Sequence, residues 1–262
     1  MQKTILYCNC SQANLTPEPT RQAAMDTLAA AGVRYLFTDD LCGLCTDAGS
    51  DLVNNLADDS LLVLACFERT VRALLNRAGL SEVKTLETVN LRTAEPQAIA
   101  EILKLTDARS GGRITLPRSN TGWQPWYPLI DEARCTNCRQ CLNFCLFGVY
   151  ALGASKHVSV TRPTHCKTGC PACARVCPSA AIIFPKYTTA PINGDAVDEQ
   201  AWKSTPPPDN LQQRLTGNVM QMLRNRTAGD RGRSLETLKD ELDIPDSVIE
   251  GLKNQTNRSA KD

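Results

Sequence analysis

Two runs of closely spaced cysteines constrain the fold of this chain more than any other feature of the sequence. The first run has the spacing Cys-x2-Cys-x2-Cys-x3-Cys and the second the spacing Cys-x3-Cys-x2-Cys-x3-Cys-Pro. Together they hold eight of the thirteen cysteines: Cys135, Cys138, Cys141 and Cys145, then Cys166, Cys170, Cys173 and Cys177. A cubane [4Fe–4S] cluster needs four thiolates at the corners of a tetrahedron, and this spacing lets one tight loop contact three irons. The two runs therefore predict two such clusters.

Zinc binding and disulfide bonding are the alternatives for so many cysteines. A structural zinc site pairs two Cys-x2–4-Cys knuckles, which leaves further cysteines of each run without a role. A disulfide framework is typical of short secreted chains, whereas this sequence starts without the apolar run and the cleavage site of a signal peptide. The sequence therefore favours iron–sulfur clusters and a reducing, cytoplasmic location.

Residues 127–187 resemble a bacterial-type two-[4Fe–4S] ferredoxin domain, in which each half reads as a strand, a cysteine loop, a short helix and a return strand. In such ferredoxins the last cysteine of one run ligates the cluster of the other run. The resemblance implies one cluster on Cys135, Cys138, Cys141 and Cys177, and a second on Cys166, Cys170, Cys173 and Cys145. The sequence departs from the pattern twice, because Leu146 stands where proline usually follows and three residues separate Cys166 from Cys170. Neither departure removes a ligand.

Charge is distributed unevenly along the chain. The net charge is +1, but residues 113–190 hold nine basic and two acidic residues, whereas residues 1–112 hold ten basic and fourteen acidic ones. Two oxidised cubanes with their thiolates carry about −4 together, so the basic residues around them largely offset cofactor charge. A basic surface is also typical of nucleic-acid binding, but no recognised nucleic-acid motif accompanies it. We therefore expect no nucleic-acid partner.

Residues 1–110 alternate short apolar runs with segments of helical spacing. Strands are predicted at residues 4–10, 33–37, 61–66 and 85–91, and helices at 17–31, 47–57, 69–78 and 96–105. Nearly continuous apolar strands with helical crossovers indicate a parallel sheet that is covered on both faces. The predicted fold is thus an α/β domain at 1–110, followed by an α+β ferredoxin-like domain at 128–187.

The first three predicted strands of this domain each lead into cysteine. The five thiols are Cys8 and Cys10, Cys42 and Cys45, and Cys66. Ligands of open parallel sheets bind outside the carboxyl ends of the strands, so we expect these thiols to converge on one edge and to form a metal or cluster site. A redox dithiol of Cys42 and Cys45 is one alternative, and plain buried cysteines are another.

Two short motifs make the expected metal or cluster site more specific. Tyr-Cys-x-Cys ending at Cys10 and Leu-Ala-Cys-Phe-Glu-Arg ending at Arg69 resemble the amino-terminal domain of the large flavin subunit of heterodisulfide reductases, over about residues 4–77. The resemblance implies that Arg69 lies near the site, and a surface cation at the start of a helix is the alternative. It also implies a third [4Fe–4S] cluster on Cys8, Cys10, Cys42 and Cys66, with Cys45 surplus or in place of Cys10. No Gly-x-Gly-x-x-Gly opens a helix in the sequence, so we expect no flavin or NAD on this chain.

The remaining segments are predicted to be linkers and a tail. Residues 111–127 read as a linker, 188–208 as a proline-rich linker, and 209–262 as a helical tail. In the tail, residues 209–226 gather apolar side chains on one helical face, which predicts docking on the parent domain or on a partner subunit. No apolar stretch is long enough for a transmembrane helix, so no membrane span is expected.

These patterns predict an iron–sulfur electron-transfer protein or subunit. It would pass electrons between a soluble carrier and another redox subunit of an oxidoreductase complex. In an alternative, Cys42 and Cys45 act on a thiol or disulfide with electrons from the ferredoxin domain. In a third interpretation, the chain is a sensor or scaffold that reports cluster occupancy through its carboxyl-terminal helices.

Overall fold

The structure, a computed structural model, describes residues 3–204 apart from 12, 47–51, 53–55, 57–59, 81–82, 84, 104–107 and 117–122. These residues lie in one compact unit, Met1–Thr205. The second unit, Pro206–Asp262, lies outside the described residues, and so does the predicted helical tail at 209–262. Most of the helix predicted at 47–57 lies outside them as well.

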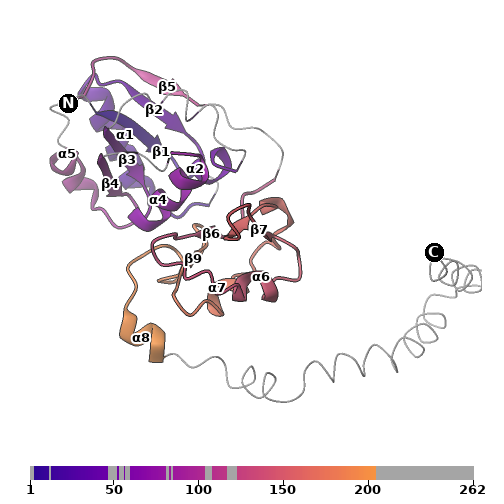
Figure 1. Ribbon diagram of the computed structural model, residues 1–262. Coiled ribbons are helices and arrows are strands. Elements are labelled where there is room, and N and C mark those ends of the chain that lie inside the picture. The colour runs from indigo at the N-terminus through magenta and orange to yellow at the C-terminus, as the bar shows by residue number, and fades with distance from the viewer. Residues whose placement is uncertain are drawn as a thin grey trace, which may run out of the picture. The chain divides into compact units, whose positions relative to one another are not determined.

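A five-stranded parallel sheet forms the amino-terminal part of the chain (Figure 1). Its strands are β1 (Thr4–Cys8), β2 (Tyr35–Thr38), β3 (Ser60–Ala65), β4 (Thr85–Asn90) and β5 (Arg113–Thr115), in the spatial order β4-β3-β1-β2-β5. All four pairings are parallel. The predicted parallel α/β fold is therefore confirmed. Because β2 and β3 lie on opposite sides of β1, the chain reverses its direction across the sheet at β1, and ligand sites favour this switch point.

Both faces of the sheet are covered, as the sequence of the central strand requires. Leu6 and Cys8 of β1 belong to a core that includes side chains of α4 (Glu68–Arg77). Ile5 and Tyr7 belong to a second core with α1 (Glu18–Ala30) and α5 (Ile99–Ile102). Successive side chains of a strand point to opposite faces, so an uninterrupted apolar strand buries both.

Three local elements differ from the sequence-based expectation. Strand β5 falls within the predicted linker at 111–127, yet it pairs with β2 at the edge of the sheet. It spans only three partly exposed residues, which is too short for a clear apolar pattern. The helix predicted at 96–105 is a 3₁₀ turn, η1 (Pro96–Ala98), followed by α5. A short helix, α2 (Leu41–Leu44), forms directly after β2, because the Asp40 side chain caps its first turn.

The cysteine-rich region consists of two halves with the same order of elements. The first half has β6 (Leu129–Ile130), α6 (Gln140–Phe144) and β7 (Tyr150–Leu152). The second has β8 (Val158–Val160), the 3₁₀ turn η3 (Pro163–His165), α7 (Ala172–Arg175) and β9 (Ile182–Ile183). Strand β6 pairs with β9, and β7 pairs with β8, so each antiparallel pair joins the two halves. This arrangement confirms the predicted repeat of strand, loop, helix and strand.

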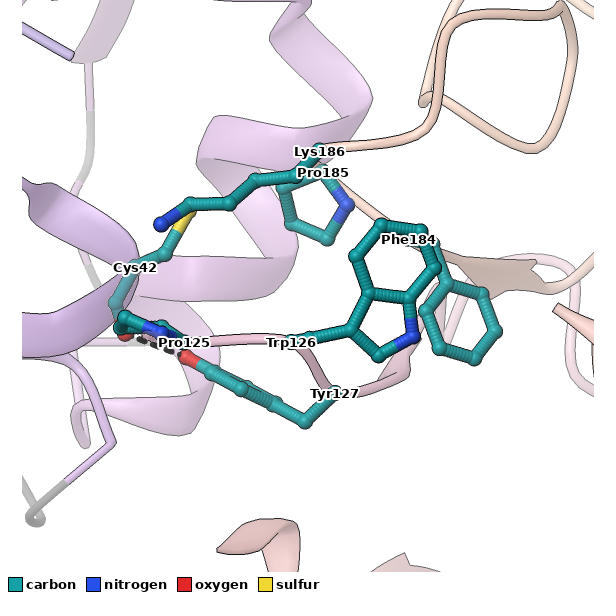
Figure 2. A pocket seen from close by; sticks show the side chains of 7 residues that line it. All are labelled: Cys42, Pro125, Trp126, Tyr127, Phe184, Pro185 and Lys186. Carbon is teal, nitrogen blue, oxygen red and sulfur yellow. Dashed lines mark hydrogen bonds between the residues drawn. The ribbon is translucent and has the colours of Figure 1, made fainter. Parts of the chain in front are cut away.

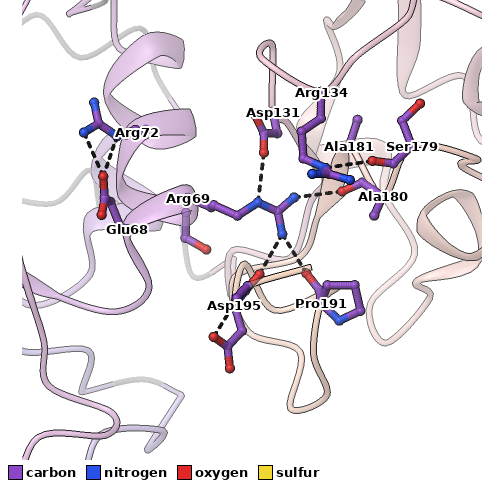
Figure 3. Close-up of polar contacts among 12 residues, drawn as sticks. Glu68, Arg69, Arg72, Asp131, Arg134, Ser179, Ala180, Ala181, Pro191 and Asp195 are labelled. Atoms are coloured by element: carbon purple, nitrogen blue, oxygen red, sulfur yellow. Dashed lines mark hydrogen bonds and ion pairs between the residues drawn. The ribbon is translucent and has the colours of Figure 1, made fainter. Parts of the chain in front are cut away.

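Arg69 at the start of α4 joins the sheet to the cysteine-rich region (Figure 3). Its guanidinium donates to Asp131 Oδ2 at 2.9 Å, and to the carbonyl oxygens of Ala180 at 2.8 Å, Asp195 at 2.8 Å and Pro191 at 3.3 Å. The resemblance to heterodisulfide reductases placed this arginine near the amino-terminal cysteines. In the structure the guanidinium is held by the other region of the chain, and Arg69 is not among the residues that line the pocket of these cysteines.

Gly194 allows a close backbone approach at the same contact. Its φ is +94°, and a Cβ atom on it would lie 1.8 Å from Thr70 Oγ1. We expect Gly194→Ala to lower the free energy of unfolding by about 1–3 kcal/mol, because both the backbone strain and the clash must be relieved. Urea denaturation measures the change. Gly112→Ala is the control, since its added Cβ would have no atom within 4 Å. Equal losses in both variants would contradict this explanation.

Candidate functional site

Four cysteines converge on one pocket at the carboxyl ends of the central strands. Cys8 is the last residue of β1 and Cys10 follows it, Cys42 lies in α2 after β2, and Cys66 follows β3. All four line a pocket with about 370 Å³ of empty space, part of it open to solvent. The adjacency of β1, β2 and β3 brings these distant parts of the chain together. Cys45 is fully buried in the core on the α4 face and is not among the residues that line this pocket.

Three charged side chains line the same pocket, and the sequence analysis did not single them out. They are Asp40, Arg92 and Lys186. Lys186 Nζ lies 2.6 Å from Asp40 Oδ2, and the two side chains are only 8% and 2% exposed. Arg92 follows β4. Residues at the carboxyl ends of parallel strands meet at one edge of the sheet, so the argument that predicted the cysteine site applies to Arg92 as well. Lys186 follows β9 in the cysteine-rich region, and no local pattern connects it with this pocket.

Burial keeps the thiols of this pocket protonated, and the two cations oppose that effect. Desolvation raises the pKa of Cys66 to about 12 and raises the pKa values of Cys8 and Cys42 well above the usual range. Burial and then the Asp40 carboxylate raise the pKa of Cys10, whereas the nearby Lys186 and Arg92 lower it. Metal ligands must be thiolates, so these cations supply part of the positive charge that ligation requires.

A second, smaller pocket lies between Cys42 and the cysteine-rich region (Figure 2). Residues 125–127 and 184–186 line it together with Cys42. The Tyr127 hydroxyl donates to the Cys42 carbonyl oxygen at 2.6 Å. Trp126 packs on Phe184 with ring centroids 5.5 Å apart, and its Nε1 donates a long hydrogen bond of 3.5 Å to the Cys170 carbonyl oxygen. One aromatic segment therefore contacts both the amino-terminal pocket and the second cysteine run.

Within the cysteine-rich region, one pocket gathers three cysteines of the first run and the last cysteine of the second. Its thiols are Cys135, Cys138, Cys141 and Cys177, and it encloses about 320 Å³ of partly open space. The pKa of Cys141 is raised to about 11, chiefly by burial and in smaller part by the neighbouring thiols of Cys177, Cys135 and Cys138. The backbone N–H of Ala181 donates to Cys177 Sγ at 3.3 Å. The structure thus brings together the first of the two cysteine sets that the ferredoxin resemblance implied.

The other four cysteines of the region also interact with one another. The pKa of Cys166 is raised to about 12, chiefly by burial and in smaller part by the thiols of Cys170 and Cys145. Burial likewise raises the pKa of Cys173 to about 12, with Cys166 and Cys145 among the neighbours that raise it. The Tyr150 hydroxyl donates to Cys173 Sγ at 3.1 Å. Cys145 of the first run also packs together with Cys166 against the core that contains Cys173.

The chemistry of these groups fits iron–sulfur clusters better than single ions. Within the part of the chain that the structure describes, no three His, Cys, Asp or Glu side chains are grouped so as to hold a metal ion. In a cubane each thiolate binds a different iron, so its four ligands enclose more space than the ligands of one ion. Two pockets are lined by four thiols each, which is the number of ligands that a cubane takes. None of the thirteen cysteines, all of which are described, forms a disulfide.

Fold and site together define an α/β unit joined to an eight-cysteine domain of the ferredoxin type. The chain is 48% identical over 61 residues to an uncharacterized ferredoxin of Methanocaldococcus jannaschii, which supports a ferredoxin-type domain. The match covers 23% of this chain and 41% of that relative, so the chain spans less than half the length of the curated relative. No family model matches the chain. The similarity of residues 4–77 to the heterodisulfide reductase subunit stays a prediction.

Among the described residues, no helix has both the length and the apolar character that crossing a bilayer requires.

Proposed function

We propose that this chain is an iron–sulfur electron-transfer protein that carries three [4Fe–4S] clusters. The observation that carries the proposal is the exchange of Cys177 into the pocket of the first run, because that exchange is the ligand pattern of two-cluster ferredoxins. The third cluster is proposed for the pocket of Cys8, Cys10, Cys42 and Cys66. When bound, each cubane takes up and releases one electron.

The protein's own groups set how readily such a site accepts negative charge. Three donors contact ligand sulfurs, namely Leu41 N on Cys8 at 3.3 Å, Ala181 N on Cys177 at 3.3 Å, and Tyr150 OH on Cys173 at 3.1 Å. Hydrogen bonds to sulfur favour the more negative, reduced state and therefore raise the reduction potential. Arg92 acts in the same direction at the amino-terminal pocket, whereas the charge of Lys186 is offset by its partner Asp40.

The aromatic segment at 125–127 supports an order for the three sites. Trp126 contacts the carbonyl of Cys170 and lines the small pocket beside Cys42, so the cluster of the second run is the neighbour of the amino-terminal site. Cys138 of the first run is exposed. We therefore place the cluster of the second run between the other two, so that it can exchange electrons with both. The proposed partners are a soluble electron carrier and another redox subunit, in the cytoplasm.

Thiol–disulfide chemistry at Cys42 and Cys45 is less well supported. Both residues are buried, burial raises the pKa of Cys45 to about 12, and it raises that of Cys42 well above its usual value. Reactive cysteines need an accessible thiol with a lowered pKa. These two cysteines have neither property.

Iron and acid-labile sulfide per chain, measured on anaerobically prepared full-length protein, test the proposal. We expect about twelve irons per chain, with EPR signals from all three clusters on reduction. About eight irons per chain would mean that the amino-terminal pocket holds no cluster. Alkylation of Cys42 and Cys45 in that protein would then favour a redox dithiol of these two cysteines. Protein that is reconstituted with iron and sulfide and still holds neither would contradict the function as a whole.

A further inference from the structure

Three large apolar side chains are exposed around Cys145. Leu146 is 93% exposed, Phe144 41% and Phe147 43%. Single exposed apolar residues are ordinary, but three within four consecutive positions form a patch of the kind that marks interaction sites. Leu146 is the most exposed of the large apolar side chains in the described part of the chain. Leu146 also stands where the ferredoxin pattern has proline. The most exposed side chain of the patch is therefore the residue that departs from the pattern.

Cys145 connects this patch to the chemistry of the domain. It is partly exposed, and it packs together with Cys166 of the second run against the core that contains Cys173. The inference rests on the proposed function, in which Cys145 ligates the cluster of that run. A molecule that covers the patch would then lie directly over a ligand of the cluster.

The surroundings of the patch are basic. Residues 113–190 hold nine basic residues and two acidic ones, of which Asp131 is paired with Arg69. Arg162 is exposed, and its Nη1 lies 3.9 Å from the place that a Cβ atom on Gly148 would take, next to Phe147. No acidic side chain of the described residues pairs with Arg162. An apolar centre with a cationic rim complements a surface with an apolar centre and an acidic rim.

We propose that Phe144, Leu146 and Phe147 form the docking surface for an acidic electron-carrier protein. In the complex, the reduced carrier loses one electron and the cluster beside Cys145 gains it, with no proton or ligand exchanged. The chain's own segment at 209–226 fits the surface less well, because it carries three arginines and one acidic residue. A second copy of the chain would bring the same basic surface into contact with itself.

Binding of the full-length, iron-loaded protein to an acidic plant-type [2Fe–2S] ferredoxin tests the surface, with calorimetry at low and at high salt. We expect binding at low salt that weakens as salt rises. Leu146→Ser is expected to weaken it roughly tenfold, since a buried leucine contributes that much or more. Arg162→Gln is expected to weaken it at low salt alone. Ile102→Ser is the control, because Ile102 is 45% exposed but lies in α5 of the sheet domain.

Several results would contradict the proposal that this patch is a docking surface for an acidic carrier. One is equal affinity of Leu146→Ser and Ile102→Ser, and another is no wild-type binding at low salt. Tighter binding by the full-length tail variant Leu215→Ser would show that the tail covers the patch. Self-association that Leu146→Ser abolishes, seen by sedimentation, would assign the patch to a second copy. Iron analysis of the same samples separates the two proposals: unloaded protein refutes the function, whereas loaded Leu146→Ser with wild-type affinity refutes only the docking surface.

Discussion

Replacing Cys66 with serine is expected to reduce the iron content from about twelve to about eight per chain. Cys66 lines the amino-terminal pocket with Cys8, Cys10 and Cys42, and each thiol there would bind one iron of the proposed third cluster. A serine hydroxyl has nearly the same size but a far higher pKa than a thiol, so it does not replace the thiolate. Iron and sulfide analysis measures the loss, and EPR shows whether the signals of the two ferredoxin-type clusters remain.

Cys45→Ser is the matched control for this experiment. Cys45 belongs to the same part of the chain, but it is fully buried and does not line the pocket. We expect Cys45→Ser to keep about twelve irons. If Cys45→Ser loses four irons while Cys10→Ser keeps them, Cys45 replaces Cys10 as the ligand, as the family resemblance allowed. If Cys66→Ser itself keeps all its iron, the pocket is not the site of the third cluster.

The ferredoxin cysteines were predictable because their signal is local. Six of the eight lie within tight loops whose spacing alone indicates three ligands to one cluster. The exchange of Cys145 and Cys177 between the two runs is not local, and it came from the family resemblance. The structure gives it a physical basis, since β6 pairs with β9 and β7 with β8, and these pairings hold the two halves together.

The amino-terminal pocket was predictable for a different reason. Three apolar strands are recognisable one by one, and a parallel sheet brings their carboxyl ends to a common edge whatever the distance between them in the sequence. The edge strand β5 was missed because three half-exposed residues carry too little pattern. Lys186 was missed because it pairs with Asp40 across 146 positions, and only the packing of one region on the other brings them together.

The contacts of Arg69 also could not be predicted from the sequence. Three of its four acceptors are backbone carbonyl oxygens, which every residue has and which therefore leave no trace in the sequence. The motif around it drew attention to Cys66 and gave no sign of the contacts that the arginine makes with the other region. The structure makes it a link between α4 and the loops around β6 and β9.

Arg69→Ala is expected to lower the free energy of unfolding by about 3–5 kcal/mol. The Arg69 and Asp131 side chains are 19% and 14% exposed, so the variant leaves a largely buried carboxylate without its partner. The carbonyl oxygens of Ala180, Pro191 and Asp195 lose their donors as well, and each unsatisfied buried group adds to the cost. Urea denaturation of the iron-loaded protein under anaerobic conditions, followed by circular dichroism, measures the change.

Arg72→Ala is the matched control, because Arg72 lies in the same helix and also forms an ion pair (Figure 3). Its side chain and that of its partner Glu68 are 54% and 55% exposed, so we expect a loss of only about 0.3–0.5 kcal/mol. Arg69→Lys separates charge from shape, since lysine keeps the attraction to Asp131 but lacks the planar fork that reaches four acceptors at once. An intermediate loss for Arg69→Lys would assign part of the effect to the carbonyl contacts. Equal losses for Arg69→Ala and Arg72→Ala would mean that Arg69 contributes no more than a surface pair, and the joint between the two regions would then depend on Tyr127 and Lys186 instead.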